Sequence, residues 1–151
     1  MFYDTHAHYD DEAFDEDRDI LLPQLHQQGI SLINDIGCDI PSSQKAISIA
    51  QQYPFVYAVV GAWPGNTGDM TEEDLETYGK LAQHPKVVAI GEIGLDYHYD
   101  DVPRDIQQHW FDRQMALADR LGKPVVIHER EAHGDGMEIV RKWADNVPGV
   151  F

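Results

Sequence analysis

Residues 87–94 read Val-Val-Ala-Ile-Gly-Glu-Ile-Gly, an apolar run with the length and composition of a buried β-strand. Similar runs occur along the rest of the chain, at Phe2–His8, Ser31–Gly37, Val56–Trp63 and Pro124–Glu129, and a sixth begins at Gly149. Their first residues, at positions 2, 31, 56, 87, 124 and 149, lie 25 to 37 positions apart. This spacing leaves room for one helix between each strand and the next.

Amphipathic segments with helix-type ends fill these gaps. Helices are predicted over about Ser42–Tyr53, with a cap at its two serines, over Thr71–His84, with an acidic first turn, and over Pro103–Gly122. Alternating strands and helices predict right-handed βαβ units on a parallel sheet. A doubly wound five-stranded sheet fits this order, and so does a (β/α)8 barrel, which needs about 250 residues.

The last two residues, Val150 and Phe151, lie inside the sixth apolar run. We therefore expect an α/β chain of the (β/α)8 TIM-barrel type, truncated to about the first five βα units and the start of the sixth strand. It is expected to form one domain over residues 1–151.

Composition excludes several classes of protein. The chain has 151 residues, of which 42% are hydrophobic, and 27 acidic against 11 basic residues give a formal charge of −16. This balance argues against binding of nucleic acid by broad phosphate neutralisation and against a polybasic membrane-surface protein. No apolar run approaches the ~18–20 residues of a membrane span. The single cysteine favours a reducing cytoplasm, and the acidic stretch Asp10–Asp17 indicates a solvated loop leading into a helix.

Histidines mark the end of the first predicted strand. His6 and His8 are two residues apart, so both imidazoles point to one face of the strand and can bind one metal ion. Such a pair also arises by chance or through packing. Asp4, in phase with both, is interpreted as a partner for an imidazole N–H or as a polar residue at the barrel floor.

Two further strand ends carry ligand-type residues. Glu92 is in phase with Ile90, and a carboxylate that continues an apolar inward face needs a cation or a hydrogen-bond donor. His128 ends the stretch Val125–His128 of the fifth run, and Arg130 just beyond that run offers a fork for a phosphate or carboxylate, or forms an ordinary salt bridge. Because parallel-sheet proteins place their sites at the carboxyl edge, three such strand ends together predict a site.

Other polar residues near these strand ends receive structural interpretations. Asp96 is predicted to be a loop or capping residue. Cys38 follows a strand end, but no sequence-linked histidine can serve as its base, so it is predicted to be a buried or loop thiol.

The segments Asp4–His8, Gly91–Tyr97 and Val126–His133 closely resemble, in this order, motifs of the TatD family of metal-dependent deoxyribonucleases. This family belongs to the amidohydrolase-like superfamily of TIM barrels. The resemblance covers the whole chain. It implies a barrel with two divalent metal ions at its carboxyl-terminal mouth, Mg²⁺ or Mn²⁺ in the first place and Zn²⁺ as an alternative. The implied reaction is cleavage of phosphodiester bonds in DNA, at ends or in single strands, by a water activated by both ions.

By position, the resemblance assigns His6 and His8 to the first metal, Glu92 to a bridge between the two and His128 to the second. Two departures are visible. The stretch Ala62–Gly65 replaces the family's usual His-Pro-His segment. A histidine after the sixth strand and a late aspartate, which supplies the candidate base, would both lie beyond the last residue.

Two alternatives remain at this stage. A C–N or ester-bond hydrolase of the same superfamily is one, although several of those carry a modified lysine where this chain has Glu92. The other is an inactive half-barrel, whose unpaired sheet edges would favour self-association.

Overall fold

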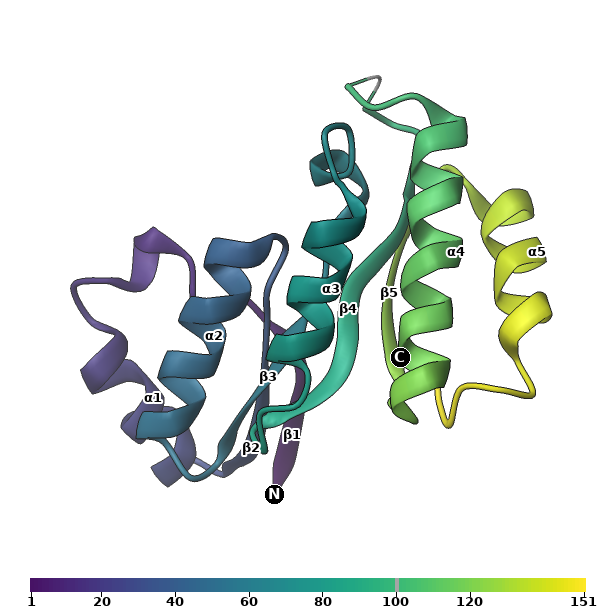
Figure 1. Cartoon of the computed structure of the whole chain (residues 1–151). Helices are drawn as coiled ribbons and strands as arrows, with labels where there is room; N and C mark the ends of the chain where they lie inside the picture. The colour runs from purple at the N-terminus through teal and green to yellow at the C-terminus, as the bar shows by residue number, and fades with distance from the viewer. Residues whose placement is uncertain (100) are drawn as a thin grey trace.

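Five parallel strands form one sheet in the computed structural model, which describes residues 1–99 and 101–151 (Figure 1). The strands stand side by side in chain order, so each pairs with the next along the sequence. Their bounds are Phe2–Ala7 (β1), Ile30–Ile36 (β2), Val56–Val60 (β3), Val87–Asp96 (β4) and Val125–Arg130 (β5). Val150 pairs in parallel with Val125, where the sixth strand was predicted to begin.

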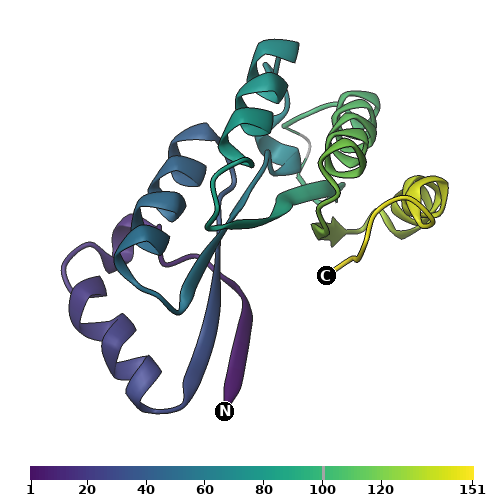
Figure 2. The same ribbon diagram turned by 60° about the horizontal axis from the view of Figure 1, so that its bottom comes forward.

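Helices connect the strands and lie in an arc on one side of the curved sheet (Figure 2). They are α1 (Arg18–Gln27), α2 (Ile40–Gln52), α3 (Glu72–Leu81), α4 (Arg104–Leu121) and α5 (His133–Trp143), with short 3-10 turns at Glu12–Phe14 and Pro64–Asn66. A doubly wound sheet would reverse its strand order and carry helices on both faces. The observed arrangement is therefore the first half of a TIM-type barrel, as predicted.

The helix ends largely follow the predicted signals. Thr71 caps α3, and Gly122 ends α4 in the left-handed conformation with φ of 62°. The cap of α2 differs from the prediction, because Asp39 is its N-cap and accepts a hydrogen bond from the backbone N–H of Ser42 at 2.8 Å. An aspartate is as good a cap as a serine, and it stands three residues earlier.

Two buried clusters hold the sheet in place. The main core lies between the sheet and the helices, and Phe111 and Met115 of α4 are among its largest fully buried side chains. A smaller cluster has one residue from each of β2 to β5: Ile36, Val59, Ala89 and Val126. Among the described helices, none is long and apolar enough to cross a membrane.

Candidate metal centre

The four residues assigned to metal binding from the sequence lie together in the structure. His6 is in β1 and His8 directly follows it, while Glu92 is in β4 and His128 in β5. Two strands separate β1 from β4 in the sheet, yet the His6 and Glu92 side chains are 3.5 Å apart because the sheet is curved. The curvature thus makes one centre out of strand ends that a flat sheet would keep apart.

Glu92 faces the centre because of an irregularity in β4. Simple alternation puts Glu92 on the face of Ile90, but Ile90 packs into the main core together with Ile93, three residues later. The pairing of β4 with β5 shifts register between these two residues. The predicted phase with Ile90 is therefore wrong, and the register shift turns the Glu92 side chain toward the histidines.

Glu92 is 7% exposed and lies between the two histidines of the first strand end. Its Oε1 is 3.5 Å from His6 Nε2, and its Oε2 is 3.9 Å from His8 Nε2. The ligand atoms of these three residues all lie within 4.8 Å of one another. Two ligand atoms that each bind one ion at about 2.1 Å lie about 3.0–3.5 Å apart. A small approach of these three side chains would therefore let them bind one cation. The donor set therefore fits the divalent metal that the resemblance implies.

His6 and His8 each present a ring nitrogen to this group. Burial lowers the pKa of His6, against the opposing effect of Glu92, and so favours the neutral imidazole that binds metals. His8 Nδ1 donates to the backbone carbonyl of Ile36 at 2.8 Å, which leaves the lone pair on Nε2. His8 is thereby held in the tautomer and orientation that ligation requires.

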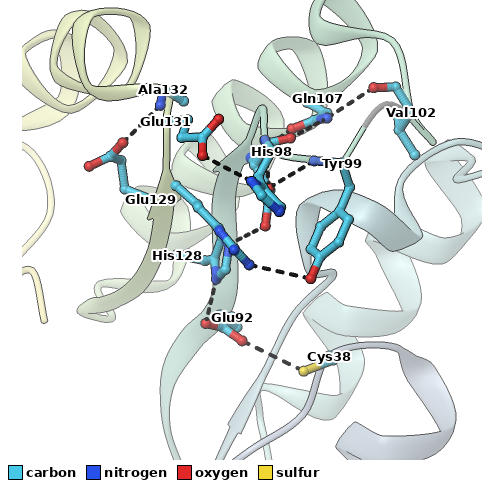
Figure 3. A network of polar contacts seen from close by, with 12 residues as sticks. Cys38, Glu92, His98, Tyr99, Val102, Gln107, His128, Glu129, Glu131 and Ala132 are labelled. Atoms are coloured by element: carbon cyan, nitrogen blue, oxygen red, sulfur yellow. Dashed lines mark hydrogen bonds and ion pairs between the residues drawn. The ribbon is translucent and has the colours of Figure 1, made fainter.

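His128 approaches Glu92 from β5 and is held between two carboxylates (Figure 3). Its Nδ1 is 3.2 Å from Glu92 Oε1, and its Nε2 is 2.8 Å from Asp96 Oδ2. Burial disfavours the imidazolium, but hydrogen bonds to the two carboxylates outweigh burial and raise the pKa of His128. Burial also acts against ionisation of Glu92 and Asp96, yet the contact with His128 leaves both pKa values below the ordinary range.

Aromatic side chains border the centre next to His128. The Trp63 ring stands edge-on to His128, with centroids 5.6 Å apart, and to Tyr99 at 6.4 Å. The Arg130 guanidinium lies 5.2 Å from the centre of the Tyr99 ring and donates to its hydroxyl at 3.3 Å. Trp63 belongs to the stretch that departs from His-Pro-His, so an aromatic surface stands where the family pattern has imidazoles.

Two residues that were given only structural interpretations also contact the centre. Asp96 does cap the following loop, since its Oδ1 accepts from the backbone N–H of His98 at 3.0 Å, but its other oxygen orients His128. The half-buried Cys38 places Sγ 3.7 Å from Glu92 Oε2 (Figure 3). Burial and the neighbouring Glu92 carboxylate raise the pKa of its thiol. Their positions at strand ends are the signal that could have identified both.

Further carboxylates lie around the end of β1. Asp4 accepts from the backbone N–H of His6 at 3.4 Å and from the Tyr9 hydroxyl at 3.5 Å. Asp10 was predicted to lie in a solvated loop but is buried, and its backbone N–H donates to Asp35 Oδ1 at 3.1 Å. Oδ1 of Asp10 and Oδ2 of Asp35 have no hydrogen-bond partner among the described residues. Burial raises the pKa of both side chains, and repulsion by Asp10 raises that of Asp35 further.

Known proteins are similar to this chain over nearly its whole length, but the chain covers only part of theirs. The protein named "Uncharacterized metal-dependent hydrolase YabD" from Bacillus subtilis (strain 168) is 40% identical over 152 residues, which cover 100% of this chain and 60% of that protein. The "3'-5' ssDNA/RNA exonuclease TatD" of Erwinia tasmaniensis is 32% identical over 93% of this chain and 55% of its own length. The chain thus spans between about half and three fifths of these curated relatives.

Solved structures agree with this picture. The crystal structure of YJJV, a TatD homolog from Escherichia coli K12, matches with a TM-score of 0.87 and 31% identity over 94% of this chain and 56% of that one. A TatD family hydrolase from Entamoeba histolytica matches with a TM-score of 0.86 and 25% identity, over 96% and 55% of the two chains. The model of the family described as TatD related DNase matches residues 3–151. The chain therefore belongs to the TatD related DNase family.

Proposed function

We propose that this chain is part of a metal-dependent deoxyribonuclease that hydrolyses phosphodiester bonds in DNA, at ends or in single strands. The observation that carries the proposal is the convergence of three imidazoles on one buried carboxylate: His6, His8 and His128 all lie within 4 Å of Glu92. The Erwinia relative, named for exonuclease action on single-stranded DNA and RNA, supports a single-stranded substrate.

The proposed cofactors are two divalent cations that share Glu92. His6 and His8 would hold the first and His128 the second, while Asp96 keeps the His128 ring in place. When bound, such ions lower the pKa of a water molecule and neutralise charge on phosphoryl oxygens. Mg²⁺ and Mn²⁺ suit a shared carboxylate, and the three imidazoles keep Zn²⁺ as an alternative.

Substrate binding follows from local rather than overall charge. The chain carries a formal charge of −16, so a phosphodiester must be recognised where positive charge is concentrated. The metal ions supply that charge, and Arg130, beside the centre, offers a planar fork to a phosphate oxygen. The aromatic surface of Trp63 and Tyr99 is of the kind on which unpaired bases stack. A broad basic groove is therefore unnecessary.

We also propose that the chain self-associates and that it works in a reducing compartment such as the cytoplasm. Large apolar side chains are exposed on the first strand and at the last residues, with Phe2 at 69% and Phe151 at 64% exposure. The one cysteine is a free thiol. Sedimentation velocity over a range of protein concentrations tests self-association, and a monomer at every concentration would contradict it.

The nuclease proposal is tested with the protein, end-labelled single-stranded DNA and Mg²⁺ or Mn²⁺. Cleavage should require the metal, stop with EDTA and fall sharply in Glu92→Gln, because the amide cannot bridge two cations. Glu76→Gln makes the same chemical change on the exposed face of α3 and should leave cleavage unchanged. Metal-dependent cleavage that survives Glu92→Gln would remove the bridging role.

The same protein, assayed with DNA and with small amide and ester substrates, separates the alternatives. Turnover of small amide or ester substrates with no action on DNA would favour a C–N or ester-bond hydrolase. Metal binding without any turnover would favour the inactive half-barrel. Cleavage of DNA that depends on both the metal and Glu92 contradicts both alternatives.

A further inference from the structure

Gln107, in α4, has a buried amide that makes three hydrogen bonds to the backbone beside the candidate metal centre. Its side chain is 2% exposed. Oε1 accepts from the backbone N–H of Asp96 at 2.8 Å, and Nε2 donates to the carbonyls of Asp96 and Val102, each at 2.9 Å (Figure 3). Both N–H groups and the oxygen of the amide are thus used. Since a buried amide is stable only when it is bonded in this way, these bonds fix the end of β4 relative to α4.

The end of β4 lies beyond the pairing with β3 that the described residues show. The pairs between these two strands end at Val60 and Ile90, whereas β4 continues to Asp96. On its other side β4 still pairs with β5, where Asp96 lies opposite Arg130. The amide of Gln107 takes the place of a neighbouring strand, because it offers one acceptor and one donor to the two backbone groups of Asp96.

Fixing the Asp96 backbone also fixes its carboxylate, which contacts His128. The Asp96 side chain is buried, and Oδ1 accepts from the backbone N–H groups of His98 and Tyr99 at 3.0 and 3.4 Å. Oδ2 is left for His128 Nε2, 2.8 Å away. With Nε2 engaged there, Nδ1 of the same ring faces the centre. Gln107 therefore reaches the imidazole through a single intervening residue.

We propose that Gln107 is a positioning residue of the candidate metal centre. Its amide sets the end of β4, Asp96 holds the His128 ring, and the ring presents Nδ1 to the second of the two proposed cations. The inference rests on the proposed function, which assigns that cation to His128. Removing the partner that holds a metal-binding histidine typically lowers metal affinity by about 10- to 100-fold. We expect loss of the Gln107 amide to act in the same direction, at the low end of that range.

Gln114 provides a matched control in the same helix. It is 1% exposed, and its amide makes a two-point contact with Ala62, accepting from the backbone N–H at 2.8 Å and donating to the carbonyl at 3.1 Å. Ala62 follows β3 and is neither a proposed ligand nor a residue to which a proposed ligand is hydrogen-bonded in the described structure. Methionine has nearly the length and volume of glutamine but forms none of these bonds. Gln107→Met and Gln114→Met therefore each remove a buried amide from α4, and only the first disturbs the contact to His128.

The test compares these two variants with the parent protein. Proton NMR of the metal-free parent should show a slowly exchanging downfield N–H of the His128 ring, held by Asp96 and assigned by its absence in His128→Asn. We expect this resonance to persist in Gln114→Met and to be lost in Gln107→Met. Calorimetry should show that the Mn²⁺ site that disappears in His128→Asn binds about 10-fold more weakly in Gln107→Met. In Gln114→Met its affinity should change by less than about 3-fold, as expected for groups without shared partners.

An unchanged resonance or an unchanged Mn²⁺ affinity in Gln107→Met, or equal losses in both methionine variants, would overturn the positioning role. A parent protein without the resonance would also overturn it, because Asp96 would then not hold the ring. Failure of the parent to bind Mn²⁺ would overturn the proposed metal centre instead, while the resonance of the metal-free protein still decides whether Gln107 positions His128. If circular dichroism shows that Gln107→Met is unfolded, Gln107→Asn, whose amide is one methylene shorter, replaces it with Gln114→Asn as its control.

Discussion

Gly94 controls how closely β4 and β5 approach at the candidate metal centre, and replacing it by alanine should separate them. Gly94 is paired with His128, the fourth proposed metal ligand. Its φ is +141°, and a Cβ built on it would lie 2.0 Å from the His128 carbonyl oxygen. Real Cβ atoms essentially never come within 3.0 Å, so the two strands must move apart by about 1 Å in an interior that is already close-packed.

The cost has two parts. Forcing a side chain into a positive-φ conformation costs about 1–3 kcal/mol, and overpacking costs about another 1–3 kcal/mol. We therefore expect Gly94→Ala to lower the free energy of unfolding by about 2–6 kcal/mol, a large part of a typical domain's stability. A shift of this size would also open the 3.2 Å contact between His128 and Glu92, and Mn²⁺ affinity should fall with it.

Gly122→Ala is the matched control. Gly122 also has a positive φ, +62°, but nothing lies within 4 Å of a Cβ built there. Only the backbone conformation is penalised, by about 1–2 kcal/mol, and the centre is untouched. Urea unfolding followed by tryptophan fluorescence gives both costs, and Mn²⁺ titration gives both affinities. If Gly94→Ala costs no more than Gly122→Ala, or binds Mn²⁺ as the parent does, the close approach of β4 and β5 does not position His128.

Three further changes probe the carboxylates. Glu92→Gln should weaken Mn²⁺ binding by at least about 10-fold, because it removes the negative charge of the carboxylate on which the histidines converge. An unchanged Mn²⁺ affinity in calorimetry would contradict this. Asp96→Asn should lower the pKa of His128, read from its imidazole NMR shifts in the metal-free protein. The stability lost in Asp96→Asn should be largest between about pH 4 and 6.5, where the carboxylate and imidazolium coexist, and should shrink as rising pH deprotonates His128; a pH-independent loss would argue against the ion pair. Asp35→Asn should stabilise the protein increasingly as pH rises above about 4. The raised pKa of Asp35 means that ionising this buried side chain beside Asp10 opposes folding, and the amide does not ionise. Equal urea unfolding midpoints for the variant and the parent protein at pH 8 would refute this.

The strands β3 and β4 could be predicted from the sequence because each is a buried run that is apolar along nearly its whole length, and the spacing of the other runs along the chain predicts strands that are less buried, such as β1. Phe2–His8 was predicted and Phe2–Ala7 is observed, and Val56–Trp63 differs from Val56–Val60 only in its last residues. The grouping of His6, His8, Glu92 and His128 could be predicted for a related reason. In a sheet whose strands are all parallel, the residues that end them meet at one edge, so no distances were needed to group them.

The contacts within the centre could not be predicted, since they depend on packing between strands. A strict period of two misplaces Glu92, because the register shift between Ile90 and Ile93 arises where β4 meets β5. Burial of Asp10 follows from its contact with Asp35, a residue 25 positions away. The acidic residues around Asp10 predict a solvated segment, and only the tertiary fold shows which of their side chains is buried.

The centre also explains how a metal-free chain can keep so much negative charge buried. Glu92 and Asp96 are 7% and 1% exposed, and ionised carboxylates buried in a medium of low dielectric need a compensating positive charge. A protonated His128 between them balances part of that charge, and its raised pKa reflects this balance. A cation that binds at Nδ1 takes the place of that proton, so metal affinity should rise with pH as His128 deprotonates. The proton on His128 and the metal therefore compete for one position, and both stabilise the same arrangement of β4 and β5.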